Sequence, residues 1–490
     1  MMDPRRDLPS QLDLVGGEWV EPVLDGVPLA HPDTGVVFAR AASTRSETLR
    51  TALAALERDT PHDGTPALPF LLRIELLTDL ADRLSALVEP IAQADAIDSG
   101  VPIAVTRLFA AGLPDVVRAA IARARAHPWE RALSTPAGDA LLLSLPWGPA
   151  AVLAPFNAPA FTAVKKSAFA IAAGCPVVLK PSPHAPHSAA WLATIMKNVI
   201  ADHSAPASTF QLVHGDRRAG ARLAVDRRIR CLAFTGSRSG GRSVAAAASA
   251  NLKPVQLECG SNNPVVVRDD APIEPTADAL VTGFTKLNGQ WCERPATAFV
   301  AEALHDRLIE ALADRIGRMR LGSCLDPGVE FGPQANAEQT EQLDGAILGM
   351  ERRGAKIVRP ICTEPSDGYL RSPVIITDID PAYTGAELFG PTLVVHRVRD
   401  DAHALGLIRK LDTGLAGYVF TADLAAGMDM GRELPVGEVK INGTSVLDLH
   451  PESEQGFWVG SGIGGHGDAA LLRFFLGARI IGPERAGLPI

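Results

Sequence analysis

Cysteine is scarce in this sequence. The 490 residues include six cysteines, and no two of them form a CxxC pair: Cys175, Cys231, Cys259, Cys292, Cys324 and Cys362. This spacing indicates neither a zinc knuckle nor a disulfide framework, so we expect no metal and a reducing, cytoplasmic environment. No uninterrupted apolar run reaches the roughly 18 residues of a membrane span. The charged start, Met1–Asp7, is not followed by the apolar core of a signal peptide, so we expect no contact with a membrane.

Charge is also moderate and spread along the chain. The net charge is −9, with acids and bases mixed and no basic stripe, which argues against nucleic acid as a partner. Apolar residues make up 47% of the composition, and a chain of 490 residues is too long for one ordinary core. The 44 glycines and 38 prolines favour many turns over a helical bundle. These values predict two or three domains.

Short apolar strands alternate with amphipathic helices through most of the chain. The strand-like segment 176–179 precedes a helix-like segment at 189–200, and a second series contains the strand-like segment 296–300 and the helix-like segment 304–319. Such alternation predicts parallel sheets covered on both faces, and therefore two α/β domains. The apolar segments 141–145 and 150–154, on either side of a Pro-Trp-Gly-Pro turn, are interpreted as a strand pair.

Four short motifs carry residues suited to chemistry. Asn288–Cys292 is a glycine-containing turn that delivers a cysteine; Val255–Gly260 is an apolar strand ending in Glu258; Ala154–Pro159 is a strand ending at Asn157 before a proline-initiated helix. The fourth combines Leu179–Ser182 with Phe234–Ser237. Each has an ordinary alternative when taken alone: a buried inert cysteine, a solvated glutamate, a helix N-cap.

In combination, these motifs resemble the aldehyde dehydrogenase superfamily over nearly the whole chain. Glu387–Pro391 is similar to its Glu-x-Phe-Gly-Pro signature, and the spacings of 34 positions from Glu258 to Cys292 and 23 from Asn157 to Lys180 match the family. Further similar segments are Gly17–Val20, Gly414–Ala416 and Ser461–Gly464. The segments Gly236–Arg242 and Gly260–Pro264 look most like the branch with ketoglutarate-semialdehyde and fatty-aldehyde dehydrogenases, whereas Phe156–Pro159 fits other branches better.

The resemblance implies an aldehyde-dehydrogenase-like α/β fold, with two parallel-sheet domains and a β-strand oligomerisation element. We expect an NAD(P)-binding domain at 1–126 and 147–257, and a catalytic domain with the cysteine nucleophile at 258–445. The oligomerisation strands and C-terminal region are expected at 127–146 and 446–490. Because an exposed strand pair is prone to further pairing, a neighbouring subunit should cover it, giving a homodimer or homotetramer.

The resemblance also implies a catalytic set of four residues. Cys292 is the expected nucleophile, because a thiolate attacks a carbonyl and later leaves readily. The Asn157 side-chain amide and the Cys292 backbone N–H would stabilise the oxyanion. Glu258 would activate the deacylating water, with Lys166 as a proton-relay partner and with a carboxylate pKa raised by an apolar site. Two alternatives stay open: a coenzyme A-acylating enzyme, disfavoured by Glu258, and a non-catalytic dehydrogenase-like scaffold, disfavoured by the presence of the whole set.

The cofactor is expected to be NAD or NADP, bound at the carboxyl ends of the strands of the first domain. The residues expected to bind it are Phe156, Lys180, Ser182, Arg218, Gly236, Ser237, Glu387 and Phe389. NAD-preferring relatives carry a glutamate three residues after the lysine, where this chain has Pro183. We therefore expect NADP to be at least tolerated, with Arg217 or Arg218 pairing with its 2′-phosphate; a solvated loop arginine is the alternative.

The substrate is an aldehyde whose class is suggested by two lysines. Lys165 and Lys286 stand where many relatives have aromatic tunnel residues, and Trp291 is also expected to contact the substrate. An unpaired buried ammonium is unfavourable, so an anionic semialdehyde would supply the partner. The alternative is that the ammonium groups reach solvent or that a local acid such as Glu293 neutralises them.

Overall fold

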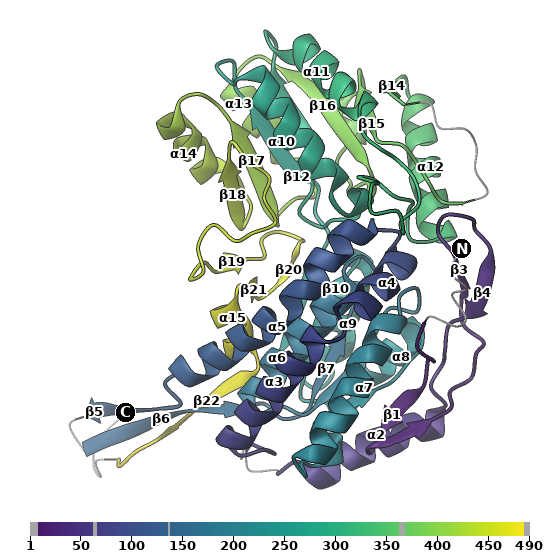
Figure 1. Ribbon diagram of the computed structural model, residues 1–490. Coiled ribbons are helices and arrows are strands. Elements are labelled where there is room, and N and C mark those ends of the chain that lie inside the picture. Colours follow the sequence, from purple (N-terminus) through teal and green to yellow (C-terminus); the bar gives the residue numbers. More distant parts are fainter. Residues whose placement is uncertain (1–7, 62–65, 136–137, 362–367, 485–490) are drawn as a thin grey trace.

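The computed structural model describes residues 8–61, 66–135, 138–361 and 368–484 (Figure 1). Cys362 and the charged start at Met1–Asp7 lie outside these residues. The other five cysteines are free thiols. None of the helices within the described ranges is long and apolar enough to cross a membrane.

An eight-stranded sheet organises the first part of the chain, in the order β2-β1-β9-β8-β7-β10-β11-β20. Its strands are β1 (Asp13–Val15), β2 (Glu18–Val20), β7 (Ala150–Leu153), β8 (Val177–Lys180), β9 (Phe210–Leu212), β10 (Cys231–Gly236), β11 (Val255–Cys259) and β20 (Gly462–Ile463). The five strands from β9 to β11 are parallel. Their carboxyl ends therefore meet at one edge of the sheet, and that edge carries Asn157, Lys180, Ser237 and Glu258.

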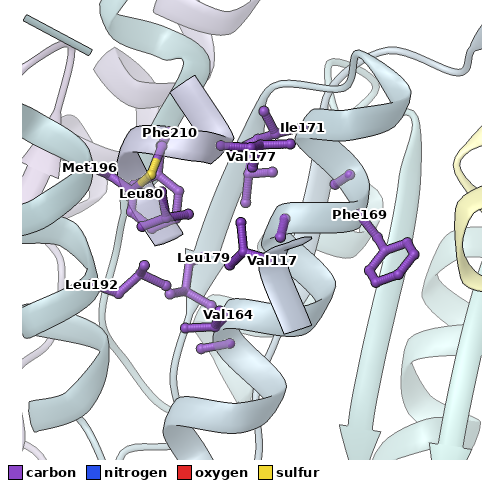
Figure 2. Close-up of a cluster of buried hydrophobic side chains, with 14 of the residues drawn as sticks. Leu80, Val117, Val164, Phe169, Ile171, Val177, Leu179, Leu192, Met196 and Phe210 are labelled. Carbon is purple, nitrogen blue, oxygen red and sulfur yellow. The ribbon is translucent and has the colours of Figure 1, made fainter. Parts of the chain in front are cut away.

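Helices cover both faces of this sheet. One face packs against α3 (Phe70–Ser85), α5 (Ile103–Ala126), α6 (Pro159–Ala173) and α7 (His187–Asp202), and the other against α2 (Ser46–Asp59), α8 (Arg217–Val225) and α9 (Arg238–Ser249). Figure 2 shows part of the first interface, where Val177 and Leu179 of β8 lie among side chains from four helices and β9. Because both faces are buried, β7 and β8 are apolar at nearly every position, as their composition predicted.

A second, seven-stranded sheet has the order β14-β15-β16-β13-β12-β17-β18. Its strands are β12 (Asn263–Val267), β13 (Pro295–Ala301), β14 (Lys356–Val358), β15 (Val374–Thr377), β16 (Thr392–Val398), β17 (Ala416–Phe420) and β18 (Glu438–Ile441). It packs against α10 (Ile273–Thr285) and α11 (His305–Gly317) on one side and α13 (Asp401–Ile408) and α14 (Leu424–Glu433) on the other. The helices α4 (Val88–Ser99), α12 (Ala337–Glu351) and α15 (Asp468–Phe474) complete the longer elements. The expected pair of α/β domains is confirmed.

The interpretation of 141–145 and 150–154 as a strand pair is wrong. β6 (Gly138–Pro146) pairs with β5 (Glu130–Thr135) and β22 (Leu476–Ile481) in a separate three-stranded sheet that projects from the body of the molecule (Figure 1). β7 instead lies inside the eight-stranded sheet, between β8 and β10. Apolar composition identified both strands, but it carries no information about which strand each one pairs with.

The C-terminal segment adds one strand to each of two sheets that earlier parts of the chain begin. Within the range 446–490, β20 extends the eight-stranded sheet beside β11, and β22 joins β5 and β6. The side chains of Leu471 and Leu472 in α15 are buried in the core of the first domain. The segment therefore contributes to the first domain as well as to the projecting strands.

Candidate active site

Cys292 lies at the end of a rigidly held turn between α10 and β13. Asn288 and Gly289 adopt positive φ angles of 58° and 77°. A Cβ at position 289 would lie 2.3 Å from the backbone of Gly390, so glycine is required there. The Asn288 amide donates hydrogen bonds to the backbone oxygens of Gly100 at 2.7 Å and Pro333 at 2.8 Å. The turn is thereby fixed from two other segments of the chain.

Asn157 faces this turn from the carboxyl end of β7. Its Nδ2 donates a hydrogen bond to the backbone oxygen of Gln290 at 2.7 Å. The N-cap of α6 is Ala158, without a side-chain cap, so Asn157 does not act as an ordinary N-cap. A second amide, that of Asn263, donates to the backbone oxygen of Cys292 at 2.8 Å. Amides from both domains therefore hold the backbone around the cysteine.

Glu258 forms a buried ion pair with Lys166. The Lys166 Nζ lies 3.3 Å from Glu258 Oε2, and it also contacts Thr235 Oγ1 at 2.5 Å and Gln256 Oε1 at 2.9 Å. Thr235 in turn donates to Glu258 Oε2 at 3.1 Å. All three donors of the ammonium group are therefore used inside the protein.

The expectation of a raised pKa for Glu258 is wrong. Burial raises the pKa most, but the positive charge of Lys166, that of His466 when the ring is protonated at acidic pH, and the hydrogen bonds from Thr235 and Lys166 outweigh it and lower the pKa to about 2. The apolar strand pattern around Glu258 suggested desolvation, whereas the charge partners come from α6 and from the C-terminal segment. The carboxylate is fully ionised at neutral pH.

Cys292 is a thiol rather than a thiolate in this environment. Burial raises its pKa well above the usual range, and the negative charges of Glu293, Glu258 and Glu387 add to the effect. A cationic group brought beside the sulfur would favour ionisation.

Three of the four catalytic candidates line one cleft together with all the expected cofactor residues, and Lys166 lies behind it, paired with Glu258. The cleft has a volume of about 850 Å³, in the range of small-molecule sites. Its lining includes Asn157, Glu258 and Cys292 as well as Phe156, Lys180, Ser182, Arg218, Gly236, Ser237, Glu387 and Phe389. These residues come from strand ends of the first sheet and from loops of the second, so the cleft lies between the two domains.

Several of these residues have the geometry of a nucleotide site. Ser237 is the N-cap of α9 and accepts a hydrogen bond from the Gly240 N–H at 3.1 Å, so the amino end of a helix opens into the cleft. The rings of Phe156 and Phe389 meet edge to face, with centroids 6.0 Å apart. Burial lowers the pKa of Lys180 to about 8.

Glu387 is a buried carboxylate with an unused oxygen. Its Oε1 has no hydrogen-bond partner among the described residues, and burial raises its pKa to about 7 despite the nearby Arg294. Its other oxygen, Oε2, would lie 2.0 Å from a Cβ at position 260, so Gly260 is needed for its approach. A buried acceptor without a partner, facing a cleft, is suited to a ligand hydroxyl.

The three expected substrate residues lie outside this lining. Lys165 forms an ion pair with Asp468 at 3.1 Å. Lys286 donates to the backbone oxygen of Thr444, and its Nζ lies 4.8 Å from the Trp291 ring centroid. Burial lowers the pKa of Lys286 to about 8. A local acid thus neutralises Lys165, although it is Asp468 and not Glu293.

The sequence interpretation missed three residues of the site. Thr235 lies within the Phe234–Ser237 motif, and Gln256 lies two residues before the expected base, so both could have been found by their position. His466 approaches Glu258 from the C-terminal segment, with its Nδ1 3.7 Å from Glu258 Oε1. It lies two residues after the Ser461–Gly464 motif, but nothing in the sequence indicated that contact.

Comparisons with known proteins agree with this arrangement. The model of the aldehyde dehydrogenase family matches residues 19–481. The chain is 31% identical to an aldehyde dehydrogenase from Deinococcus radiodurans, with 92% of this chain and 88% of the relative covered. Among solved structures, it resembles an NAD-dependent aldehyde dehydrogenase from Sinorhizobium meliloti, with a TM-score of 0.90, 25% identity and coverage of 99% and 98%. It also resembles a betaine aldehyde dehydrogenase from Staphylococcus aureus in complex with NAD+, with a TM-score of 0.91, 24% identity and coverage of 98% and 97%.

Proposed function

The chain belongs to the aldehyde dehydrogenase family, and we propose that it oxidises an aldehyde to the carboxylic acid with NAD+ or NADP+, through a thioester on Cys292. One observation carries this proposal: a single cleft is lined by a cysteine, a glutamate and an asparagine together with the residues suited to a dinucleotide. A scaffold that only bound cofactor would have no need of a buried ion pair that holds a carboxylate at the cysteine end of that cleft.

Cys292 forms the covalent bond to the substrate. Its sulfur attacks the aldehyde carbon, and the oxygen becomes an oxyanion that needs preorganised donors. The Asn157 amide is held by the Gln290 backbone oxygen through one N–H, which leaves its second N–H for the oxyanion. Loss of one such donor typically raises the barrier by about 2.7–4 kcal/mol.

Glu258 acts on the second half of the reaction. A water molecule attacks the thioester, and Glu258 takes one of its protons. Its low pKa keeps it ionised and ready, while Lys166 and Thr235 hold it in place. The presence of this base favours release of a free acid over transfer of the acyl group to coenzyme A.

The cleft residues fit a nicotinamide dinucleotide. The unpartnered Oε1 of Glu387 suits a ribose hydroxyl, and Ser237 with the amino end of α9 suits the pyrophosphate. When bound, the nicotinamide supplies the hydride acceptor for oxidation on Cys292. Two of the structurally similar proteins are named as NAD-dependent or as NAD+ complexes, which supports the same cofactor here.

NADP+ should be accepted as well as NAD+. Pro183, Arg217 and Arg218 line the cleft beside Lys180, so no carboxylate repels a 2′-phosphate at that position. Arg218→Gln should raise the KM for NADP+ about tenfold and leave that for NAD+ unchanged. Arg222→Gln is the matched control, because Arg222 lies on the same helix and donates to Ser46. A kcat/KM for NAD+ more than about a hundredfold above that for NADP+ would refute the idea.

An anionic semialdehyde remains the proposed substrate class, and of the two lysines only Lys286 still supports it. Lys165 already forms an ion pair with an acid, whereas Lys286 contacts a backbone oxygen and an indole ring and feels the charge of Glu293 without pairing with it. Succinic semialdehyde and butanal have the same chain length and differ in the terminal carboxylate. We expect the wild type to prefer succinic semialdehyde and Lys286→Met to lose that preference. A wild type that prefers butanal contradicts the proposal.

A second copy of the chain is proposed to cover the projecting sheet. Leu141 of β6 and Ile480 and Ile481 of β22 are exposed there. Exposed apolar strands favour pairing with another chain. Light scattering after size exclusion should give the mass of a dimer or tetramer.

The test of the proposed function follows reduced nicotinamide by absorbance, with several aldehydes, in the presence and absence of coenzyme A. Cys292→Ala should abolish turnover and leave folding and cofactor binding intact. Cys324→Ala, a buried cysteine on another segment, should keep the wild-type rate. Glu258→Gln should complete one round of cofactor reduction and then stall. Steady turnover by Cys292→Ala would end the thioester mechanism, and acceleration by coenzyme A would favour the acylating alternative.

A further inference from the structure

The C-terminal segment brings a histidine to the proposed base. β20 pairs antiparallel with β11, so that Gly462 lies opposite Glu258. The chain then turns through Gly464, at a φ of 92°, into β21 (Gly465–His466), where His466 pairs with Gln455 of β19 (Gln455–Gly456). The backbone pairing of two short strands therefore fixes the approach of His466 to Glu258.

His466 stands between two carboxylates. Its Nδ1 lies 3.7 Å from Glu258 Oε1, and its Nε2 lies 3.8 Å from Asp448 Oδ1. The two ring nitrogens thus face a base inside the active-site cleft and an acid outside it. Asp448 and His466 both line a surface pocket of about 190 Å³. The imidazole lines that pocket and lies next to Glu258, which lines the cleft.

Burial favours the neutral form of His466. Burial lowers its pKa, and Lys165 and Lys166 lower it further, while Glu258 and Asp448 raise it. Lys165 is itself paired with Asp468. Each ring nitrogen faces a carboxylate, and in the tautomer with hydrogen on Nε2 the Nδ1 lone pair faces Glu258.

We propose that His466 carries the proton that Glu258 takes from the deacylating water to Asp448 and the surface pocket; this rests on the proposed thioester mechanism. The water oxygen bonds to the acyl carbon, the carbon–sulfur bond breaks, and its electron pair stays on Cys292. One water proton moves to Glu258 and then to Nδ1 of His466. The proton on Nε2 leaves to Asp448 and to solvent, so the ring is neutral again and Glu258 is ionised again.

On the side away from His466, Glu258 contacts groups in the interior of the protein. Lys166 is almost fully buried, and its three donors are used by Glu258, Thr235 and Gln256. Glu258 also holds a proton poorly, because its pKa is about 2, so a proton taken from water needs a better acceptor nearby. The imidazole is such an acceptor, and it is the one of these neighbours that borders the surface pocket.

The experiment measures the acyl-enzyme directly. His466→Gln keeps a polar side chain of similar size but cannot relay a proton. With the better of butanal and succinic semialdehyde, intact-mass spectrometry during turnover should show the acyl adduct accumulating on His466→Gln and not on the wild type. Turnover should fall by about 10²-fold, while the first round of cofactor reduction keeps its amplitude. Asp448→Asn should give a smaller effect in the same direction.

Two controls separate a relay from a structural role. Imidazole added to His466→Gly should restore turnover in a saturable manner, which a packing defect would not allow. Glu452, on the same segment as His466, pairs with Arg123 of α5, and Glu452→Gln should behave as wild type. Turnover of His466→Gln within about twofold of wild type, or no acyl adduct on it, overturns the relay alone. Absence of any reduced nicotinamide with the wild type overturns the proposed function and the relay together.

Discussion

The buried ion pair between Lys166 and Glu258 should dominate the local stability of the active site. The perturbation is Lys166→Met, which keeps the length of the side chain and removes the charge. The pKa of Glu258, lowered from 4.5 to about 2, corresponds to about 3 kcal/mol of favourable interaction beyond the burial penalty. Lys166 supplies the largest favourable part of it, so the variant leaves a buried carboxylate with only Thr235 and His466. We expect a loss of about 3–5 kcal/mol in the free energy of unfolding at pH 7.

Two further measurements identify the cause. The double variant Lys166→Met/Glu258→Gln should be more stable than Lys166→Met, because no unpaired buried charge remains. The folded-state pKa of Glu258 lies below its unfolded value, so its contribution is present above about pH 4.5 and is lost as the pH falls toward 2. In Lys166→Met, burial should instead raise the pKa of Glu258. The destabilisation should therefore be largest at neutral pH and shrink below pH 4.5.

Urea denaturation at pH 7 and at pH 4, followed by tryptophan fluorescence, measures the stability of the wild type, the single variant and the double variant. A loss below about 1 kcal/mol for Lys166→Met at pH 7, or a double variant no more stable than the single one, would refute the reasoning. Either result would mean that solvent and His466 stabilise the negative charge of Glu258 without the lysine.

Three other outcomes are expected. Asp95 is fully buried, and burial raises its pKa to about 8, so the folded state binds a proton that the unfolded state releases above about pH 4. Asp95→Asn should therefore stabilise the protein more at pH 9 than at pH 5 in thermal melts. Equal gains at the two pH values would contradict this. Gly260→Ala should displace Glu387 and raise the KM for the cofactor about tenfold, whereas Gly345→Ala, with open space around its Cβ, should not. Alkylation of cofactor-free Cys292 by iodoacetamide should accelerate with pH to beyond pH 9 because its thiol pKa is raised, and a plateau below pH 8 would disprove the buried-thiol assignment.

The sequence by itself determined the fold class and most of the elements. Strands buried on both faces must be apolar along their length, and their alternation with amphipathic helices allows only a parallel sheet. The strand-like segment 176–179 therefore lies within one residue of β8 (Val177–Lys180) at each end. The chemistry-bearing residues were also identifiable, because Asn157, Glu258 and Ser237 follow or end strands, and strand ends of a parallel sheet meet at one edge.

The tertiary structure alone decided which charges meet. Glu258 was recognisable as the end of an apolar strand, but its low pKa depends on Lys166 from α6 and His466 from the C-terminal segment. The neutralisation of Lys165 likewise depends on Asp468, some 300 positions away in the chain. The separation of β6 from β7 depends on the partners that β5 and β22 provide. Coulombic interactions and strand pairing act through space, so contacts between segments distant in the sequence are set by packing and not by local composition.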